Sequence, residues 1–296
     1  MKGDTRIPGK EKVTLEDLIR KDGVTQRVIS MFQTHIYGYY QEKGRIFPWR
    51  DTDNPYCILV SEIMLQQTQT ERVIQKYNEF TTLFPDFPSL ARAPLQKVLE
   101  VWHGLGYNKR AKALKKTAEI VTIRYNGVLP SNTKVLQTFP GIGKATAGAI
   151  SAFAFHNPVS FIETNIRTVF IYFFFQGETS IKDKDILPLV EKTLDTTNPR
   201  EWYYALTDYG VMLKKSDNTL NKRSFHYQKQ PPFKGSNRQI RGTVLKVLLG
   251  TPYTESELTR ELTRILHCSS ERVMGVLDQL EKEGFITRKG CVIRIS

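Results

Sequence analysis

Cysteine is scarce in this chain. Of its 296 residues only three are cysteines, Cys57, Cys268 and Cys291, and no two of them form a CxxC pair. Such wide spacing excludes a disulfide framework and a cysteine-rich metal cluster. We therefore predict no metal ligands among the cysteines.

Long apolar runs are missing as well. The longest, Thr168 to Phe175, is short and aromatic, so it predicts a buried helix and no membrane contact. The first residues, Met1 to Asp4, lead into no apolar signal segment. We expect a soluble cytoplasmic protein, associated with the nucleoid.

Acidic residues are few compared with basic ones. The chain holds 43 Lys and Arg against 30 Asp and Glu, which gives a formal net charge of +13. This balance favours a polyanionic partner, most often nucleic acid, although a merely cationic protein is the alternative. With 40% hydrophobic residues, the chain can bury a core of one large domain, or of a large and a small one.

Apolar periodicity predicts a mostly α-helical chain. Residues 1–20 are polar and charged and are interpreted as a tail. From 21 to 213, apolar residues recur at three- and four-residue spacing, and Pro and Gly mark the joins. The predicted helices cover residues 25–43, 55–80, 94–104, 108–125, 132–138, 144–155, 164–175, 183–195 and 199–213.

Residues 214–238 differ in composition. Lys and Arg greatly outnumber acids there, and Pro, Gly and aromatic residues are interspersed. Two interpretations stay open for this segment: a linker, or an extended loop that contacts nucleic acid.

Residues 239–296 show a third pattern. A helix is predicted at 242–250, and Thr254 with Glu257 resembles a capping box that opens a second helix. Ser269 or Ser270 opens a third, and a hairpin with Lys289-Gly290 at its turn follows. Three helices and a hairpin predict a small winged-helix-like domain, a module that binds DNA in some proteins and protein in others.

One carboxylate stands in unusual surroundings. Glu62 has apolar residues on both sides, from Ile58 to Leu65. Burial of a lone carboxylate is costly unless it is paired, hydrogen-bonded or protonated, and this is one way to build a proton donor. The alternative is a structural Glu that caps backbone groups or pairs with an Arg.

Two glycine-containing turns suggest contacts with DNA. Gly141 and Gly143 lie between helical segments, where bare backbone N–H groups and the next helix N-terminus can seat a phosphate, with Lys144 adding charge. An ordinary helical turn gives a similar pattern. The turn at 104–106 enters a helix with a basic face at Lys109, Lys112 and Lys116, which is either a DNA contact or a solvated surface, and Tyr107 could act as a wedge in a base stack.

Two further groups have chemistry that suits a base or sugar site. Trp49 and Arg50 could stack on a base and steer a carboxylate, or could be a core Trp with a surface Arg. Glu163 opens a very apolar segment and could simply cap a helix. Paired with Glu62, it could instead stabilise positive charge on a sugar during cleavage of a glycosidic bond.

Four motifs together resemble one known family. In chain order they are Trp49-Arg50, the run from Ser61 to Thr70, the turn from Gly104 to Tyr107 and the hairpin from Pro140 to Gly143. They are similar to the MutY-type adenine DNA glycosylases of the helix-hairpin-helix superfamily, which includes endonuclease III. The resemblance covers roughly residues 25–213. It implies a mostly α, two-lobed helix-hairpin-helix DNA glycosylase domain at 21–213, followed here by the winged-helix-like domain at 239–296.

The resemblance also implies an activity and a set of residues. Such an enzyme flips adenine out of a mismatch with 8-oxoguanine or guanine in double-stranded DNA and hydrolyses its glycosidic bond. Glu62 matches the acid that protonates the purine at N7, and Glu163 matches a second catalytic carboxylate. The expected base-pocket residues are Arg45, Trp49, Arg50, Leu65, Ala145 and Asn165, and the expected DNA-binding residues are Gln66, Gln67, Tyr107, Lys109, Gly141, Gly143, Lys144 and Thr146.

Four departures from the family shape these expectations. Glu163 stands where the family has Asp. Ala145 stands where lyases carry a Schiff-base Lys, which implies a monofunctional glycosylase. No cysteine follows Met212, so we expect no iron–sulfur cluster and no other cofactor, with the basic 214–238 segment taking over DNA contacts. The MutT-like domain that reads 8-oxoguanine is absent from this chain.

Several alternatives remain open at this point. The same fold could excise another base, such as thymine or uracil opposite guanine, or hypoxanthine. The chain could also be a non-catalytic DNA-binding protein. We expect a monomer in either case.

Overall fold

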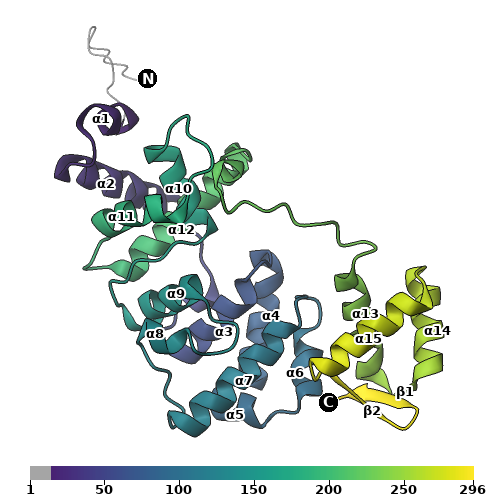
Figure 1. Ribbon diagram of the computed structural model, residues 1–296. Helices are drawn as coiled ribbons and strands as arrows, with labels where there is room; N and C mark the ends of the chain where they lie inside the picture. Colours follow the sequence, from purple (N-terminus) through teal and green to yellow (C-terminus); the bar gives the residue numbers. More distant parts are fainter. Residues whose placement is uncertain (1–14) are drawn as a thin grey trace, which may run out of the picture. The chain divides into compact units, whose positions relative to one another are not determined.

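A computed structural model describes residues 15–296 of the chain and is helical almost throughout (Figure 1). Most of the predicted N-terminal tail lies outside the described residues, but its last part, 15–20, is helical. The helices are α1 (Leu15–Asp22), α2 (Gln26–Lys43), α3 (Pro55–Leu65), α4 (Thr70–Leu83), α5 (Phe87–Arg92), α6 (Leu95–Trp102), α7 (Lys109–Arg124), α8 (Thr133–Leu136), α9 (Lys144–Phe155), α10 (Thr164–Phe174), α11 (Asp183–Thr193), α12 (Pro199–Ser216), α13 (Asn237–Gly250), α14 (Glu255–Leu266) and α15 (Ser270–Lys282), with short 3-10 turns η1 (Pro48–Arg50) and η2 (Leu220–Arg223) and strands β1 (Tyr253–Thr254), β2 (Ile286–Lys289) and β3 (Val292–Ile295).

The long helix predicted at 55–80 is wrong, because the chain turns between α3 and α4. Gln67 has a φ of 53°, in the left-handed region, and Thr68 N donates to Leu65 O at 3.2 Å to close the turn. Periodicity missed this break, since no Gly or Pro marks it. It also missed the short helix α5, which Asp86 opens with a capping box.

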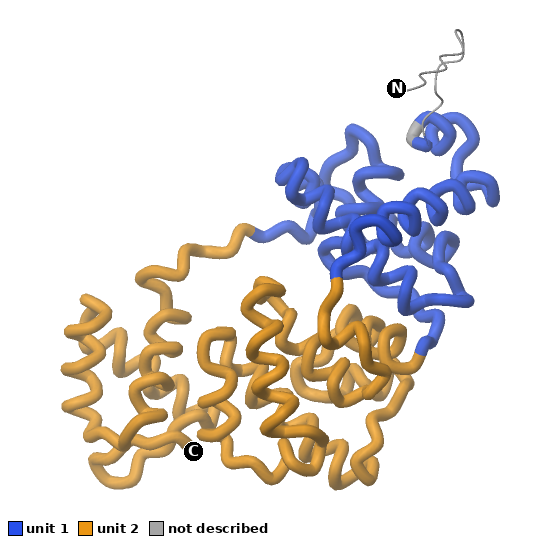
Figure 2. The backbone as a smooth tube through the Cα atoms, turned by 180° about the vertical axis from the view of Figure 1, so that it is seen from behind, with its two compact units in different colours: residues 1–45, 156–228 blue, residues 46–155, 229–296 orange. Residues whose placement is uncertain are grey.

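The described chain divides into two compact units, each built from two separate stretches (Figure 2). Unit 1 contains residues up to 45 and 156–228, and unit 2 contains 46–155 and 229–296. The predicted 21–213 domain is therefore distributed over both units, in agreement with a two-lobed fold.

Unit 1 is organised around the apolar helix α10. Phe170 and Phe173 of α10 are fully buried and meet Phe32 of α2 edge-on, at ring-centroid distances of 5.7 and 5.3 Å. Trp202 of α12 also meets Phe32 edge-on, at a ring-centroid distance of 5.7 Å. The apolar run from Thr168 to Phe175 is thus the buried helix that was predicted.

Unit 2 places α3 between α9 and α4, with α5, α6 and α7 beside them. None of the helices in residues 15–296 has the length and apolar character needed to cross a bilayer.

The C-terminal part of unit 2 has the three helices and hairpin that the sequence predicted. The antiparallel strand order is β1-β3-β2, and Thr254 opens α14 with the predicted capping box. Ser269 caps α15. The first helix, α13, starts earlier than expected, at Asn237, where Ser236 caps it.

These three helices belong to the same compact unit as α7 and dock on that helix. Lys112 Nζ donates to the carbonyls of Glu283 and, at 2.8 Å, of Gly284, just after α15. A cation is favourable there, since a helix C-terminus carries partial negative charge. The Glu283 carboxylate pairs with Lys109 at 2.9 Å and with Arg241 at 2.5 Å. Of the basic face of α7, Lys109 and Lys112 thus contact the residues that follow α15, whereas Lys116 stays exposed.

Candidate active site

Glu62 lies near the end of α3, in unit 2. Asn54 caps α3 by accepting from Tyr56 N at 2.9 Å, and Pro55 sits at the first helical position, where its missing N–H costs nothing. Ser61 and Ile63 on either side of Glu62 are buried, and Glu62 itself is half-buried. Burial of most of α3 holds Glu62 on a rigid element.

Arg110 fixes the end of α3 and was missed by the sequence analysis. Its Nη1 donates to Ile63 O and Met64 O, both at 2.8 Å, and to Gln66 O at 2.5 Å. Its Nη2 donates to Thr68 Oγ1 at 2.9 Å and to the Leu105 and Gly106 carbonyls at 3.2 and 3.3 Å.

Burial lowers the pKa of Arg110 to about 10, so the side chain stays charged at neutral pH. It clamps the turn after Glu62 to the turn before Tyr107. Its spacing from Leu114 and Thr117, both buried on α7, is the signal that could have placed it inside.

The helix-hairpin-helix turn lies between α8 and α9. Gly141 has a φ of +78°, and a Cβ there would meet Ala113 Cβ at 3.1 Å, so glycine is required. Gly141, Gly143 and Lys144 are exposed at the start of α9, as an anion seat requires. Gln66 Nε2 donates to Gly141 O and Thr146 Oγ1, both at 3.1 Å, so Gln66 ties this hairpin to the end of α3.

The structure brings Gln67 and Tyr107 together through a residue that the sequence analysis did not single out. Gln230 Nε2 donates to the Tyr107 hydroxyl and lies 3.5 Å from Gln67 Oε1. Arg238 Nη1 donates to the same hydroxyl at 2.8 Å. Both Gln67 and Tyr107 have left-handed backbone, with φ values of 53° and 47°, a conformation that non-glycine residues rarely adopt without a local reason. Lys109, in contrast, pairs with Glu283.

Four of the predicted base-pocket residues lie in unit 2, and they differ in burial. Trp49 is only 4% exposed, stacked on Phe47 at 5.0 Å and edge-on to Tyr77 at 5.4 Å. This burial favours the core interpretation of Trp49. Arg50 lies over the Phe47 ring at 5.1 Å. The remaining two, Leu65 at the end of α3 and Ala145 in the first turn of α9, are half-buried.

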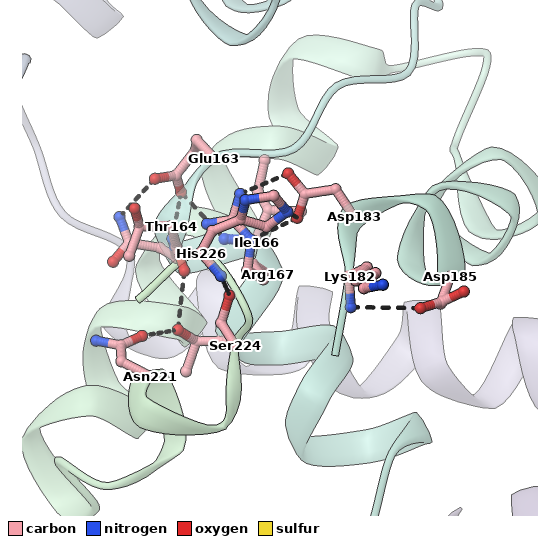
Figure 3. Close-up of polar contacts among 12 residues, drawn as sticks. Glu163, Thr164, Ile166, Arg167, Lys182, Asp183, Asp185, Asn221, Ser224 and His226 are labelled. Carbon is pink, nitrogen blue, oxygen red and sulfur yellow. Dashed lines mark hydrogen bonds and ion pairs between the residues drawn. The ribbon is translucent and has the colours of Figure 1, made fainter. Parts of the chain in front are cut away.

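Glu163, in unit 1, is the N-cap of α10 (Figure 3). Its Oε1 accepts from Asn165 N at 2.9 Å and Ile166 N at 3.0 Å, and its Oε2 accepts from Asn165 Nδ2 at 3.2 Å. The Asn165 amide oxygen in turn accepts from Lys214 Nζ at 3.1 Å. The capping alternative is therefore present in the structure, and it fixes the orientation of the carboxylate.

Arg45, predicted in the base pocket, forms a buried ion pair within unit 1. Its backbone N and its Nε each donate to the Asp208 carboxylate at 2.7 Å, and Nη2 lies 2.6 Å from Oδ1. Asp208 is only 2% exposed. This ion pair gives Arg45 a structural role, in addition to the predicted contact with a base.

The segment after α12, where the family resemblance implies the cysteines of an iron–sulfur cluster, is folded onto α10. Leu220 is buried, Asn221 Oδ1 accepts from Thr168 Oγ1 at 2.5 Å, and Arg223 Nε donates to Glu178 O at 2.8 Å. Arg167 forms a two-point ion pair with Asp183, at 2.6 and 2.8 Å (Figure 3).

In residues 15–296 no group of three His, Cys, Asp or Glu side chains could hold a metal ion. Without four cysteines, a four-thiolate cluster does not fit this chain.

Comparisons with known proteins agree with this arrangement. A profile described as "HhH-GPD superfamily base excision DNA repair protein" matches residues 60–193. The adenine DNA glycosylase of Buchnera aphidicola subsp. Baizongia pistaciae is 37% identical over 186 residues, which cover 62% of this chain and 52% of that protein. The adenine DNA glycosylase of Mycobacterium tuberculosis strain H37Rv is 31% identical over 250 residues, covering 76% of this chain and 81% of that one. The chain thus spans about half the length of the first relative and most of the second.

Solved structures show the same fold. A thermostable thymine-DNA glycosylase superposes with a TM-score of 0.58 at 26% identity, covering 66% of this chain and 89% of that one. Endonuclease III in a trapped covalent complex with DNA gives a TM-score of 0.51 at 19% identity, covering 72% and 92%, a likeness of fold alone. By its sequence matches and its fold, the chain belongs to the HhH-GPD superfamily of base excision DNA repair proteins, within its MutY-type adenine DNA glycosylases.

Proposed function

We propose that the chain is a monofunctional DNA glycosylase of base excision repair that removes adenine mispaired with 8-oxoguanine or guanine from double-stranded DNA. The observation that carries the proposal is Glu62, half-buried on α3 among apolar residues, with the end of its helix clamped by Arg110. The adenine DNA glycosylases to which the chain is similar supply the substrate class. The enzyme would act as a monomer, on the DNA of the nucleoid.

Glu62 is the proposed general acid. Its proton goes to N7 of the flipped adenine, which draws electrons out of the bond between N9 and C1′. That bond breaks, adenine leaves as a neutral base, and C1′ becomes oxocarbenium-like. Water then adds to C1′ and releases a proton, which leaves an abasic site.

Glu163 is the proposed second carboxylate, which stabilises the positive charge on the sugar. One methylene longer than the family's Asp, it would shift its oxygens by about 1–1.5 Å on an unchanged backbone. Its two backbone contacts at the start of α10 hold the longer side chain in a fixed direction. Glu163→Asp should therefore retain measurable excision, whereas Glu163→Ala should not.

Ala145 supports hydrolysis without strand cleavage. An alanine offers no amine to attack C1′, so no Schiff base forms at that position. The DNA strand should stay intact after base release and break only on treatment with hot alkali.

The test uses labelled duplexes that carry A opposite 8-oxoguanine, A:G, G:T, G:U or hypoxanthine, each split with and without hot alkali. Glu62→Gln should abolish excision but keep DNA binding. Glu79→Gln is a matched control, since Glu79 is exposed and pairs with Lys76 on α4. Tight binding without cleavage of any duplex would point to a non-catalytic DNA-binding protein.

A second candidate is excision of thymine opposite guanine, favoured by the similarity to a thymine-DNA glycosylase structure. The same panel separates the two, because cleavage would then appear at G:T. A pyrimidine has no N7, so protonation there cannot explain a loss of thymine excision in Glu62→Gln.

A further inference from the structure

Two donors from the start of the C-terminal part of unit 2 meet at Tyr107. Gln230 and Arg238 both donate to its hydroxyl, and the Arg238 guanidinium also lies 5.6 Å from the ring centroid. Gln230 reaches Gln67 as well. One short segment therefore contacts both Gln67 and Tyr107, two of the DNA-binding residues that the family resemblance implies.

This segment, residues 229–241, is called the reading segment below, and it is held in shape by its own contacts. Arg238 Nη2 donates to Pro231 O at 2.6 Å and closes the loop. Arg272 Nη2 donates to Gly235 O at 2.6 Å from α15. α15 is itself anchored on α7 through Lys112, so the C-terminal helices fix where the reading segment lies within unit 2.

The reading segment has the composition of a surface that contacts nucleic acid. It contains Lys and Arg but no acidic residue, and its Phe233 ring is 60% exposed. Cations beside an exposed aromatic ring suit phosphates and unstacked bases. Of its polar side chains, Gln230 and Arg238 are the two that contact Tyr107.

We propose that the reading segment recognises the base left opposite the excised adenine, with Arg238 as the principal donor and Gln230 as the second. When adenine flips out, the Watson–Crick edge of the opposite base is exposed. Guanine and 8-oxoguanine present an acceptor there, O6, where cytosine presents an amino donor. In the free protein the Tyr107 hydroxyl oxygen takes the place of that acceptor.

This inference rests on the proposed function, together with the expected role of Tyr107 as a wedge in the base stack. It places recognition of the opposite base in the segment that leads into the C-terminal helices. Arg238 and Gln230 would determine which opposite base is preferred, whereas Glu62 would protonate the adenine.

The experiment compares A:G, A:C and adenine opposite an abasic site. Affinities are measured in a Glu62→Gln background, and single-turnover excision rates in the otherwise unchanged enzyme. Arg238→Ala should reduce the preference for A:G over A:C by about tenfold, the usual effect of one good donor–acceptor contact. Arg264→Ala removes the same charge from α14, where the exposed Arg264 pairs with Glu261, and should leave that preference unchanged.

A second comparison separates direct reading from an effect through Tyr107. In a Tyr107→Leu background, an apolar wedge remains but the hydroxyl and ring contacts are gone. If Arg238 contacts the base, Arg238→Ala should still reduce the preference in this background. Loss of the effect there would mean that Arg238 acts only by holding Tyr107, and would overturn the proposal.

The two proposals fail in different ways. An absence of excision with every duplex would overturn the proposed function, while the affinity ratio in Glu62→Gln would still report on the reading segment. Excision of adenine at equal rates and affinities opposite guanine and cytosine would overturn the reading segment alone. So would an equal loss of preference in Arg238→Ala and Arg264→Ala.

Discussion

At the scale of single residues, side chains far apart in sequence decide how the site is held. Arg110 satisfies carbonyls at the end of α3 and in the turn before Tyr107 with one guanidinium. A planar fork with five N–H donors can do this, whereas an ammonium group cannot reach as many acceptors.

We predict that Arg110→Met lowers the free energy of unfolding by about 3 kcal/mol, because several buried carbonyls lose their donor. Arg110→Lys should recover only part of the loss. Denaturant unfolding monitored by circular dichroism measures both. Lys116→Met is the control, since Lys116 is an exposed residue of the same helix that pairs with Glu119. Equal stability of all three variants would contradict the clamp.

The sequence pointed to Glu62 as the candidate acid, but not to the residues that hold its helix in place. Apolar neighbours pointed to Glu62, and the position of Glu163 ahead of an apolar run allowed the cap that the structure has. Partners of Arg45 and Arg110 could not be predicted. Asp208 lies 163 residues after Arg45, and periodicity carries no information on which distant carbonyl or carboxylate a buried cation will meet.

At the scale of helices and strands, the sequence predicted the features that depend on contacts between residues close in sequence. The capping box at Thr254, the cap at Ser269 and the hairpin after Phe285 are confirmed. The break after α3 was not predictable, because Gln67 adopts its left-handed backbone in a turn whose carbonyls and hydroxyl are held by Arg110. Tertiary contacts there override the periodic pattern.

The crossing of α10 and α12 in unit 1 depends on one glycine. A Cβ at Gly210 would lie 2.3 Å from Asn165 O, so Gly210→Ala must push the two helices apart. We expect a loss of about 2 kcal/mol or more in unfolding free energy, in the range of overpacking effects.

Gly242→Ala on α13 is the matched control for this helix crossing. An added Cβ at Gly242 meets no atom of the described chain within 4 Å. Since alanine is the better helix former, this variant should be neutral or slightly more stable. Thermal unfolding of the two variants side by side tests both expectations, and a stable Gly210→Ala protein would contradict the close crossing.

Docking of the C-terminal helices should depend on pH through Glu283. Burial raises the pKa of this carboxyl, but hydrogen bonds and charge from Lys109 and Arg241 outweigh burial and lower it overall. A carboxyl with a lowered pKa in the folded state stabilises that state above its unfolded pKa of about 4.3, and this contribution disappears as pH falls through the folded value.

We therefore expect the docking contribution to be constant at neutral pH and to be lost below about pH 4. Hydrogen exchange of α15 amides at a series of pH values measures it. In Glu283→Gln, which cannot ionise, the same acid step in exchange should be smaller. An identical step in both proteins would show that other carboxyls cause it.

At the scale of the whole molecule, we propose that the basic 214–238 segment takes over the DNA contacts that the family resemblance assigns to an iron–sulfur cluster loop. Asn221, Leu220 and Arg223 hold its first part, 214–228, against the rest of unit 1 through side-chain contacts. We predict that the purified protein contains no stoichiometric iron, shows no visible absorbance from a cluster, and keeps its melting temperature in the presence of a chelator. Iron at four atoms per chain would contradict this.

Because each unit is built from two separate stretches, neither can close until its second stretch has been synthesised. Unit 1 cannot close when its first helices emerge, because Asp208, the partner of Arg45, is synthesised 163 residues later. Unit 2 likewise waits for Gln230 before Tyr107 acquires its contact. Nascent chains should therefore expose α2 for most of translation, because α12, which packs on it, is synthesised late. We expect chaperone binding during synthesis and slow refolding from denaturant.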